Sequence, residues 1–210
     1  MNPNATRMQP DLATDAPALI RWSLEQAAQR GGPAIVTSNF RPYASVMLHL
    51  VTREQPDLPV IWMDSGYNTA ETYRHAEQLR QLLGLNLQVY VPARTRAQRE
   101  ALEGPPPSRD DARFAAFVEE VKLEPFARAL RDFKPSVWLH GARGSDTEHR
   151  ATLQPVSVNE QGILKVAPLL SWTTRDLHQY AQQQGLPNNW EYFDPTKPDP
   201  AAECGLLVSN

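Results

Sequence analysis

The feature that most constrains the fold is the stretch 34–51, which reads AIVTSNFRPYASVMLHLV. Residues 34–37 form a short apolar run that predicts a buried strand, 38–42 are polar, and 43–51 carry apolar residues at helical spacing. A helix that follows a strand in this way begins with unpaired backbone N–H groups and a partial positive charge. The turn therefore predicts a seat for a phosphate or sulfate group, although several turns of any α/β protein share this layout.

Four further apolar runs predict strands, so that strands and helices alternate along the chain. Asp15 and Asn68 are predicted to cap two of the helices, the second with Glu71 in the capping-box position. The sequence predicts an α/β fold with an open, mostly parallel five-stranded sheet flanked by helices and a flexible C-terminal tail. The predicted strands are 34–37, 60–63, 87–91, 137–140 and 163–166, and the predicted helices are 16–30, 43–51, one that begins after 68, 110–133 with a break at Pro125, and 173–184.

Polar turns follow three of the predicted strands, at 38–42, 64–67 and 141–150, and the third contains two arginines. In a right-handed parallel arrangement these turns meet at the edge of the sheet where open α/β sheets bind ligands. The sequence therefore predicts a ligand site at this edge.

Composition limits the function further. The 210 residues carry a net charge of −3, so there is no broad electrostatic attraction to nucleic acid. No apolar run approaches the roughly 20 residues of a membrane helix, and the polar start lacks the regions of a signal peptide, so we expect a cytoplasmic protein. Cys204 is the one cysteine, which excludes an intramolecular disulfide, a multi-cysteine zinc site and a cysteine-ligated iron–sulfur cluster.

Short motifs follow one another in a fixed order along nearly the whole chain. They are SNF at 38–40, ASV at 44–46, DSGY at 64–67, ETY at 71–73, KLEP at 122–125, the turn 141–151, KVAPL at 165–169 with Trp172 and Asp176, and ECGL at 203–206. Their order and spacing resemble the phosphoadenosine phosphosulfate (PAPS) reductase family, whose nucleotide-binding fold is related to that of the PP-loop ATP pyrophosphatases.

The resemblance implies a nucleotide-binding domain over 1–185 and a tail over 186–210. It also implies thioredoxin-dependent reduction of PAPS to sulfite and adenosine 3′,5′-bisphosphate, in assimilatory sulfate reduction and cysteine biosynthesis. Guanidinium and backbone N–H groups suit the anionic oxygens of such a substrate, and a strand-end carboxylate can accept hydrogen bonds from ribose or adenine. The implied substrate-binding residues are Ser38, Asn39, Phe40, Arg41, Asp64, Ser65, Gly66, Arg143, Arg150 and Lys165, with no metal ligand.

Cys204 is the implied nucleophile. A lone intracellular cysteine is most often a small buried hydrophobe, but this one lies in a polar, proline-rich tail and in a motif that resembles the family's nucleophile motif. A tail that folds over the site would bring the thiol near Arg143 and Arg150, which favour the thiolate. The resemblance implies that the thiolate attacks the sulfate sulfur and that thioredoxin or glutaredoxin resolves the S-sulfonate.

Four departures from the family pattern leave alternatives open. Arg41 and Pro42 stand where glycine is usual, and Pro42 lacks an N–H donor. Gly144 replaces a second arginine, Leu207 replaces a histidine, and the stretch 188–204 is shorter than the family's arginine-bearing insert. One alternative is a non-catalytic or regulatory nucleotide-binding relative. The other is a PP-loop enzyme that adenylates a substrate with ATP and magnesium, against which the missing Ser-Gly-Gly-x-Asp-Ser loop argues.

The resemblance also bears on cofactors and partners. Relatives that reduce adenosine phosphosulfate carry cysteine pairs that ligate an iron–sulfur cluster, and Phe117 and Val118 occupy the place of the first pair here. We therefore expect no bound cofactor and thioredoxin or glutaredoxin as the electron donor. The family further suggests a homodimer.

Overall fold

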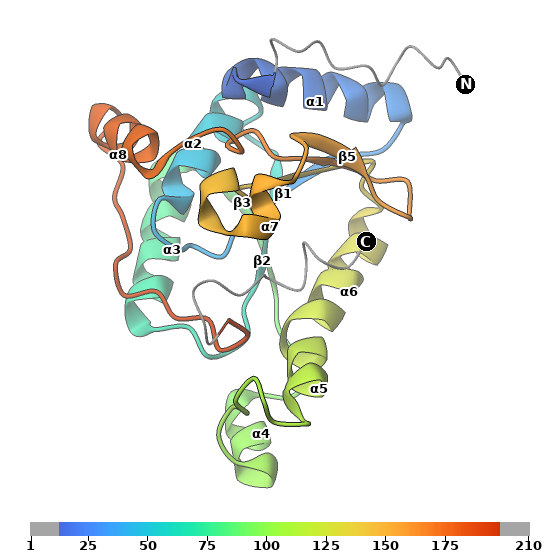
Figure 1. Ribbon diagram of the computed structural model, residues 1–210, viewed down its shortest axis with the longest axis vertical. Coiled ribbons are helices and arrows are strands. Elements are labelled where there is room, and N and C mark those ends of the chain that lie inside the picture. The colour runs from blue at the N-terminus through green and yellow to red at the C-terminus, as the bar shows by residue number, and fades with distance from the viewer. Residues whose placement is uncertain (1–12, 198–210) are drawn as a thin grey trace.

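The computed structural model describes residues 13–197, and these form an α/β fold around one open sheet (Figure 1). The six strands follow the order β3-β2-β1-β4-β6-β5, and each neighbouring pair is parallel except β5 with β6. The predicted fold class is confirmed, whereas the motif around Cys204 lies outside the described residues. The strands are β1 (Ala34–Thr37), β2 (Pro59–Met63), β3 (Asn86–Tyr90), β4 (Val137–His140), β5 (Val156–Val158) and β6 (Leu164–Val166).

The predicted number of strands, five, is wrong because β5 was missed. This strand has three residues and pairs antiparallel with β6 at the edge of the sheet. Its side chains are mostly exposed, and half of the surface of Val158 is accessible. An edge strand this short leaves no hydrophobic period in the sequence.

Helices flank the sheet and take up most of the remaining chain within the described residues. They are α1 (Ala16–Arg30), α2 (Ala44–Glu54), α3 (Ala70–Leu83), α4 (Arg96–Glu103), α5 (Phe114–Val118), α6 (Glu124–Phe133), α7 (Glu148–Ala151) and α8 (Thr174–Gln183), with a π-helical turn η2 (Glu119–Leu123) and a 3-10 turn η3 (Gly144–Asp146). None of the described helices is long and apolar enough to cross a membrane.

Of the two helix caps predicted from the sequence, one is confirmed and one is wrong. Asp15 caps α1 as expected, since its carboxylate accepts the Ala18 N–H at 3.0 Å. The cap predicted at Asn68 is wrong, because Thr69 caps α3 and its hydroxyl accepts the Thr72 N–H at 3.0 Å. Asn68 instead donates its side-chain amide to Asp64, at 2.7 Å.

The helix predicted at 110–133 is divided into α5, η2 and α6. Pro125 lies at the beginning of α6, which continues directly from η2, and proline has no N–H to donate there. The irregularity falls in η2 just before it, since a wider turn accommodates the lost donor. Figure 1 shows α5 and α6 stacked end to end, with α4 projecting away from the sheet.

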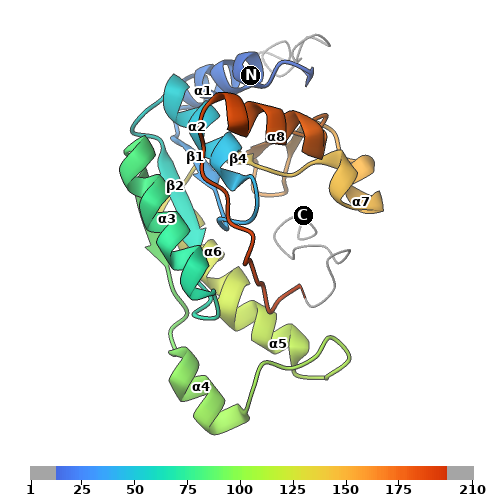
Figure 2. The ribbon, with the colours of Figure 1, turned by 90° about the vertical axis from the view of Figure 1, so that its left-hand side faces the viewer.

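Both faces of the sheet are buried, so its central strands are apolar without interruption. In β1, Val36 packs into a cluster with α1, α2, α3 and α8, and Ile35 packs into a second cluster with α6. In the second cluster, Phe126 and Trp138 have ring centroids 4.8 Å apart. Figure 2 shows α1, α2 and α8 together above the sheet and α6 on the other side of it.

Residues 188–197, which we call the strap, cross the loops that follow β1 and β2. Asn188 accepts the Tyr43 N–H at 2.6 Å. Asn189 is fully buried and donates to the Phe40 carbonyl at 3.1 Å and to the Thr72 hydroxyl at 2.9 Å. The root of the predicted tail therefore packs on the body of the protein, and the boundary at 185 stays a prediction.

The far end of the strap is held by a buried ion pair. Lys122, in η2, donates to the Asp194 carboxylate at 2.7 Å and to the Thr196 hydroxyl at 2.8 Å. Burial alone would raise the pKa of Asp194, but Lys122 and the bonds from Thr196 outweigh it and lower that pKa. The strap is thus fixed to the body at both ends.

We expect Asn189→Ala to destabilise the protein by about 1–3 kcal/mol, because it leaves a buried carbonyl without its donor. Urea-induced unfolding of the variant and the wild type measures this loss. Gln182→Ala removes an exposed amide on α8 and is the matched control, with an expected change within about 0.5 kcal/mol. Equal stabilities for the Asn189 variant and the wild type would show that the hydrogen bonds of Asn189 contribute nothing to the stability of the fold.

Candidate active site

The order of strands reverses at the boundary between β1 and β4. The chain runs from β1 outward through β2 to β3 on one side, and β4 continues to β6 on the other. Open α/β sheets bind ligands beyond the carboxyl ends of the strands at such a switch point. Thr37 pairs with His140 at the ends of these two strands, so the loop after β1 and the turn after β4 face each other across the boundary.

The loop after β1 contains four of the predicted residues. Phe40 has a left-handed backbone with φ of 54°, and its side chain is fully buried against Trp62, with ring centroids 4.8 Å apart. Only the backbone of Phe40 is therefore available to a ligand. The Ser38 hydroxyl accepts the Phe40 N–H at 3.2 Å, and the side-chain Oδ1 atom of Asn39 accepts the Arg41 N–H at 3.3 Å.

These bonds occupy N–H groups that a phosphate nest would use. Pro42 has no N–H, and the Tyr43 N–H is donated to the strap at Asn188. Asn39 also contacts the strap, since its amide donates to the Tyr192 hydroxyl at 2.7 Å. Oxyanion binding by the backbone of this loop stays a prediction. The cationic side chains around the loop are the stronger candidates for binding an oxyanion.

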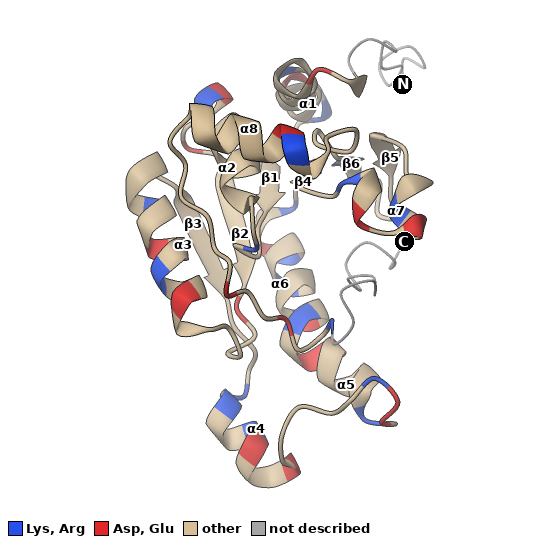
Figure 3. Cartoon of the chain, turned by 60° about the vertical axis from the view of Figure 1, so that its left-hand side comes forward, with Lys and Arg blue, Asp and Glu red and all other residues tan. Residues whose placement is uncertain are grey.

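Three of the predicted arginines meet at one carboxylate, that of Asp146 in η3. Arg41 and Arg150 both donate to its Oδ2 atom, at 2.7 Å and 2.9 Å, and Arg143 donates to its Oδ1 atom. We call these four residues the arginine cluster. Arg41 comes from the loop after β1, and the other three residues come from the segment after β4 that runs into α7, so the cluster spans the switch point. Figure 3 shows α7, with acidic and basic residues on it, beside β5 and β6.

Further bonds fix two of the three guanidinium groups. Arg41 donates to the Gly141 carbonyl at 3.2 Å, and Arg143 donates to the Thr174 hydroxyl in the first turn of α8 at 2.9 Å. The Nε atom of Arg143 is buried and has no hydrogen-bond partner among the described residues. The bonds within the cluster therefore fix the positions of its side chains, and the Nε–H of Arg143 remains available to donate to a ligand.

The charge of the arginine cluster is reflected in the pKa of Asp146. Burial alone would raise this pKa, but Arg41, Arg143 and Arg150 outweigh burial and lower it. Asp146 is thus ionised at neutral pH, and three guanidinium groups face one carboxylate. The net positive charge suits an oxyanion with more than one charge.

The loop after β2 is organised by Asp64. Its Oδ1 atom accepts the Gly66 N–H at 2.9 Å, the Asn68 amide at 2.7 Å and the Tyr73 hydroxyl at 2.9 Å. Ser65 closes the same turn by accepting the Tyr67 N–H at 3.3 Å, and Gly66 takes a φ of 81°. These contacts give Asp64, Ser65 and Gly66 a structural task, and their contact with a nucleotide stays a prediction.

Lys165 lies on β6, next to β4, with its Nζ atom 5.5 Å from the centroid of the Trp138 ring. Burial lowers its pKa. His140 ends β4, the strand next to β6, and its pKa is lowered to about 3 by burial and by the positive charges of Lys165 and Arg150. His140 is therefore neutral, and its Nδ1 atom has no hydrogen-bond partner within the described part of the chain.

Sequence reasoning missed Asp146 and His140. Asp146 lies in the turn already singled out for its two arginines, so an acidic residue three positions after Arg143 was an available signal. His140 ends a predicted strand, and its sequence context resembles that of a core residue.

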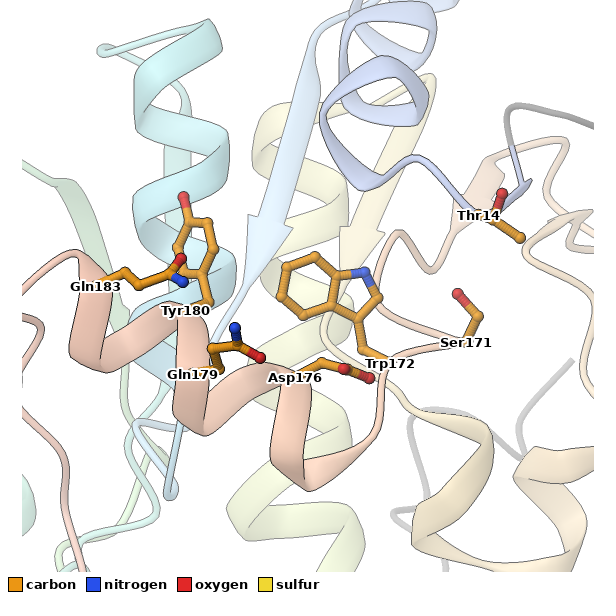
Figure 4. A pocket seen from close by; sticks show the side chains of 7 residues that line it. All are labelled: Thr14, Ser171, Trp172, Asp176, Gln179, Tyr180 and Gln183. Atoms are coloured by element: carbon orange, nitrogen blue, oxygen red, sulfur yellow. The ribbon is translucent and has the colours of Figure 1, made fainter.

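A pocket on the described surface lies away from the switch point. It has a volume of about 400 Å³ and lies between the start of α1 and α8, where Trp172, Asp176 and Tyr180 line it (Figure 4). Asp176 is already engaged in the capping box of α8 with Thr173. None of the predicted substrate-binding residues lines this pocket, and we assign it no role.

The low pKa of His140 predicts an acid-sensitive fold. The unfolded chain binds this proton at its ordinary pKa of 6.5 and the folded chain at about 3, so stability falls as the pH is lowered through this window, by up to about 1.4 kcal/mol per unit. His140→Gln removes this contribution.

We expect the stability lost between pH 7 and pH 5 to be about 2 kcal/mol smaller in the His140 variant than in the wild type, measured by urea unfolding at both values. His149→Gln, at an exposed position, controls for the loss of an imidazole. An identical loss in the His140 variant and the wild type would contradict the prediction.

Comparisons with known proteins identify the family of this chain. The family model for the phosphoadenosine phosphosulfate reductase domain matches residues 33–194. A phosphoadenosine 5′-phosphosulfate reductase from Synechococcus sp. is 36% identical over 189 residues, covering 88% of this chain and 79% of the relative. One from Synechocystis sp. is 39% identical over 181 residues, covering 85% and 70%.

Among solved structures, the phosphate complex of PAPS reductase from Candida auris superposes with a TM-score of 0.68 at 21% identity, covering 81% of each chain. At this identity the superposition supports the fold alone. The sequence matches cover most of the chain, include every loop of the switch point, and show that the protein belongs to the phosphoadenosine phosphosulfate reductase family.

Proposed function

We propose that the protein is a thioredoxin-dependent PAPS reductase, which converts PAPS to sulfite and adenosine 3′,5′-bisphosphate in the cytoplasm as part of assimilatory sulfate reduction. The observation that carries the proposal is the arginine cluster at the switch point of a chain with this family membership. Three guanidinium groups from two loops match a substrate whose reacting end is a phosphate joined to a sulfate.

The binding step depends on the cluster and its surroundings. Arg143 and Arg150 are largely buried, so their bonds to oxyanion oxygens form away from bulk water, where charge-assisted bonds are strongest. Lys165 adds a point charge one strand away. Asp64, Ser65 and Gly66, at the end of β2, are proposed to face the ribose or adenine, since they end the strand next to β1.

Cys204 is the proposed nucleophile. Its thiolate attacks the sulfur of the sulfate group, the bond between that sulfur and the bridging oxygen breaks, and adenosine 3′,5′-bisphosphate leaves with the electron pair. The product is an S-sulfonate on Cys204. One thiolate of reduced thioredoxin then displaces sulfite from it and forms a mixed disulfide, and the second thiol of thioredoxin resolves this disulfide and restores the Cys204 thiol.

Partners and cofactors follow from the same family membership. We propose thioredoxin or glutaredoxin as the electron donor, a homodimer as the assembly, and no iron–sulfur cluster, since the chain has one cysteine. A homodimer and glutaredoxin rest on the resemblance alone.

A second candidate is a nucleotide-binding relative without reductase activity. The observation that favours it is the engagement of the loop after β1, where Ser38 and Asn39 accept N–H groups and Arg41 is paired with Asp146. Such a protein would bind adenosine 3′,5′-bisphosphate without forming sulfite.

Cys204→Ser should abolish sulfite formation and leave affinity for adenosine 3′,5′-bisphosphate within about threefold, because a hydroxyl is a far weaker nucleophile of similar size. Turnover is followed with reduced thioredoxin and PAPS, and mass spectrometry of the wild type should find a sulfonate on Cys204. Ser209→Ala, in the same tail, is the control. A serine variant that still forms sulfite would overturn the catalytic assignment, and nucleotide binding without any sulfonate would favour the second candidate.

Arg143→Lys should weaken binding of adenosine 3′,5′-bisphosphate about tenfold or more, since it removes the fork of a guanidinium and its buried Nε donor. Titration calorimetry measures the affinity. Arg131→Lys, at an exposed position on α6, is the matched control and should bind as the wild type does. Equal affinities for the Arg143 variant and the wild type would remove Arg143 from the site.

A further inference from the structure

The arginine cluster contains its own anion. Asp146 receives bonds from Arg41, Arg143 and Arg150, and among the described residues all the ion pairs of these arginines go to Asp146. A phosphate or sulfate that enters the switch point needs the same guanidinium groups. Asp146 therefore has two opposite effects, since it orders the donors and repels the ligand.

The ordering effect follows from burial. The side chains of Asp146, Arg143 and Arg150 are 10%, 13% and 5% exposed, so without a carboxylate between them the guanidinium groups would repel one another in a poorly solvated place. Asp146 offsets that repulsion and holds them together before a ligand arrives. Arg41 is tied to this group across 105 residues of sequence.

The cluster can also accept a ligand without being dismantled. Each guanidinium has five N–H donors, of which Arg41 uses those of its Nη2 atom for Asp146 and Gly141, and Arg143 uses one each for Asp146 and Thr174. Arg143 still has a buried Nε atom without a partner in the described part of the chain. A bound oxyanion would therefore lie next to Asp146, close enough for their like charges to interact strongly.

We infer that Asp146 is a positioning and specificity-determining residue, an internal counter-ion that assembles the three guanidinium groups and limits how tightly they hold an oxyanion. The inference rests on the proposed function in placing the anionic end of an adenine nucleotide at the arginine cluster, and it is independent of whether sulfite is formed. A site that binds its product less tightly releases it more readily, which is a use for such a residue in an enzyme.

The test replaces Asp146 by Asn, which keeps the shape and removes the charge. The probes are adenosine 3′,5′-bisphosphate and inorganic phosphate, and titration calorimetry at several salt concentrations gives their affinities. We expect Asp146→Asn to bind the bisphosphate about five- to thirtyfold more tightly than the wild type, with a steeper loss of affinity as salt is added, because the site gains one positive charge.

Two further variants separate charge from structure. Asp146→Glu keeps the charge and should restore the wild-type affinity within about threefold. Asp57→Asn removes an exposed carboxylate just before β2, at the opposite end of the strands, and should leave binding unchanged. Without ligand, Asp146→Asn should melt at a lower temperature than the wild type, and the bisphosphate should raise its melting temperature by more.

Unchanged or weaker binding by Asp146→Asn, with an intact fold by circular dichroism, would overturn the inference and leave Asp146 as a purely structural ion pair. Absence of binding of either probe to both forms would overturn it as well. Failure of the proposed function has a different signature, since the wild type would then bind the bisphosphate and the variant would bind it more tightly, while neither forms sulfite from PAPS and reduced thioredoxin.

Discussion

The parallel pairing of β1 with β4 is the constraint on which the site depends. Their register aligns Ala34 with Val137 at one end and Thr37 with His140 at the other. The two loops that leave these strands therefore start side by side, although Arg41 and the Gly141 carbonyl that it contacts are 100 residues apart in sequence. The helices on both faces hold this pairing by burying the apolar side chains of both strands, so the geometry of the site is set by the core.

The switch point concentrates positive charge, and the structure manages that charge in three ways. The carboxylate of Asp146 compensates part of it within the arginine cluster. His140 remains neutral, because burial and the nearby cations lower its pKa. Lys165 has a lowered pKa through burial, and its ammonium lies 5.5 Å from the Trp138 ring, where the π-electrons attract it. An anionic ligand would therefore enter a region that is positive but already ordered.

The sequence predicted the elements of the fold better than their contacts. Apolar runs located five of the six strands, including the edge strand β3. β5 was missed because this short edge strand is mostly exposed and has no such run. Phe40 was placed in a ligand loop by its motif, yet its left-handed backbone turns the ring into the core against Trp62. Likewise, Asn68 and Thr69 are both good caps by type, and only the Asp64 carboxylate, which binds the Asn68 amide, decides between them.

In the site as well, the sequence predicted which residues matter better than which residues they contact. Sequence reasoning put Arg143 and Arg150 in one turn and Arg41 in another loop, and the structure brings all three together. The spacing of Asp146 from Arg143 and Arg150 was a signal that sequence reasoning left unused, but nothing in the sequence shows that Arg41, from another loop, pairs with Asp146 as well. Ligand contact by Asp64, Ser65, Gly66 and Lys165 stays a prediction. The first three form hydrogen bonds within their own turn, and Lys165 lies against the Trp138 ring.

The strap connects the loop after β1 to the beginning of the predicted tail. Its contacts use the same loop that supplies Arg41, since Asn188 accepts the Tyr43 N–H and Asn189 binds the Phe40 carbonyl. Neighbouring groups that share hydrogen-bond partners do not respond independently to change. A shift at residues 188–189 must therefore alter the backbone on either side of Arg41, and with it the distance from that guanidinium to Asp146. The loop, the strap and the arginine cluster form one polar unit, which links the position of the chain before the tail to the geometry of the oxyanion site.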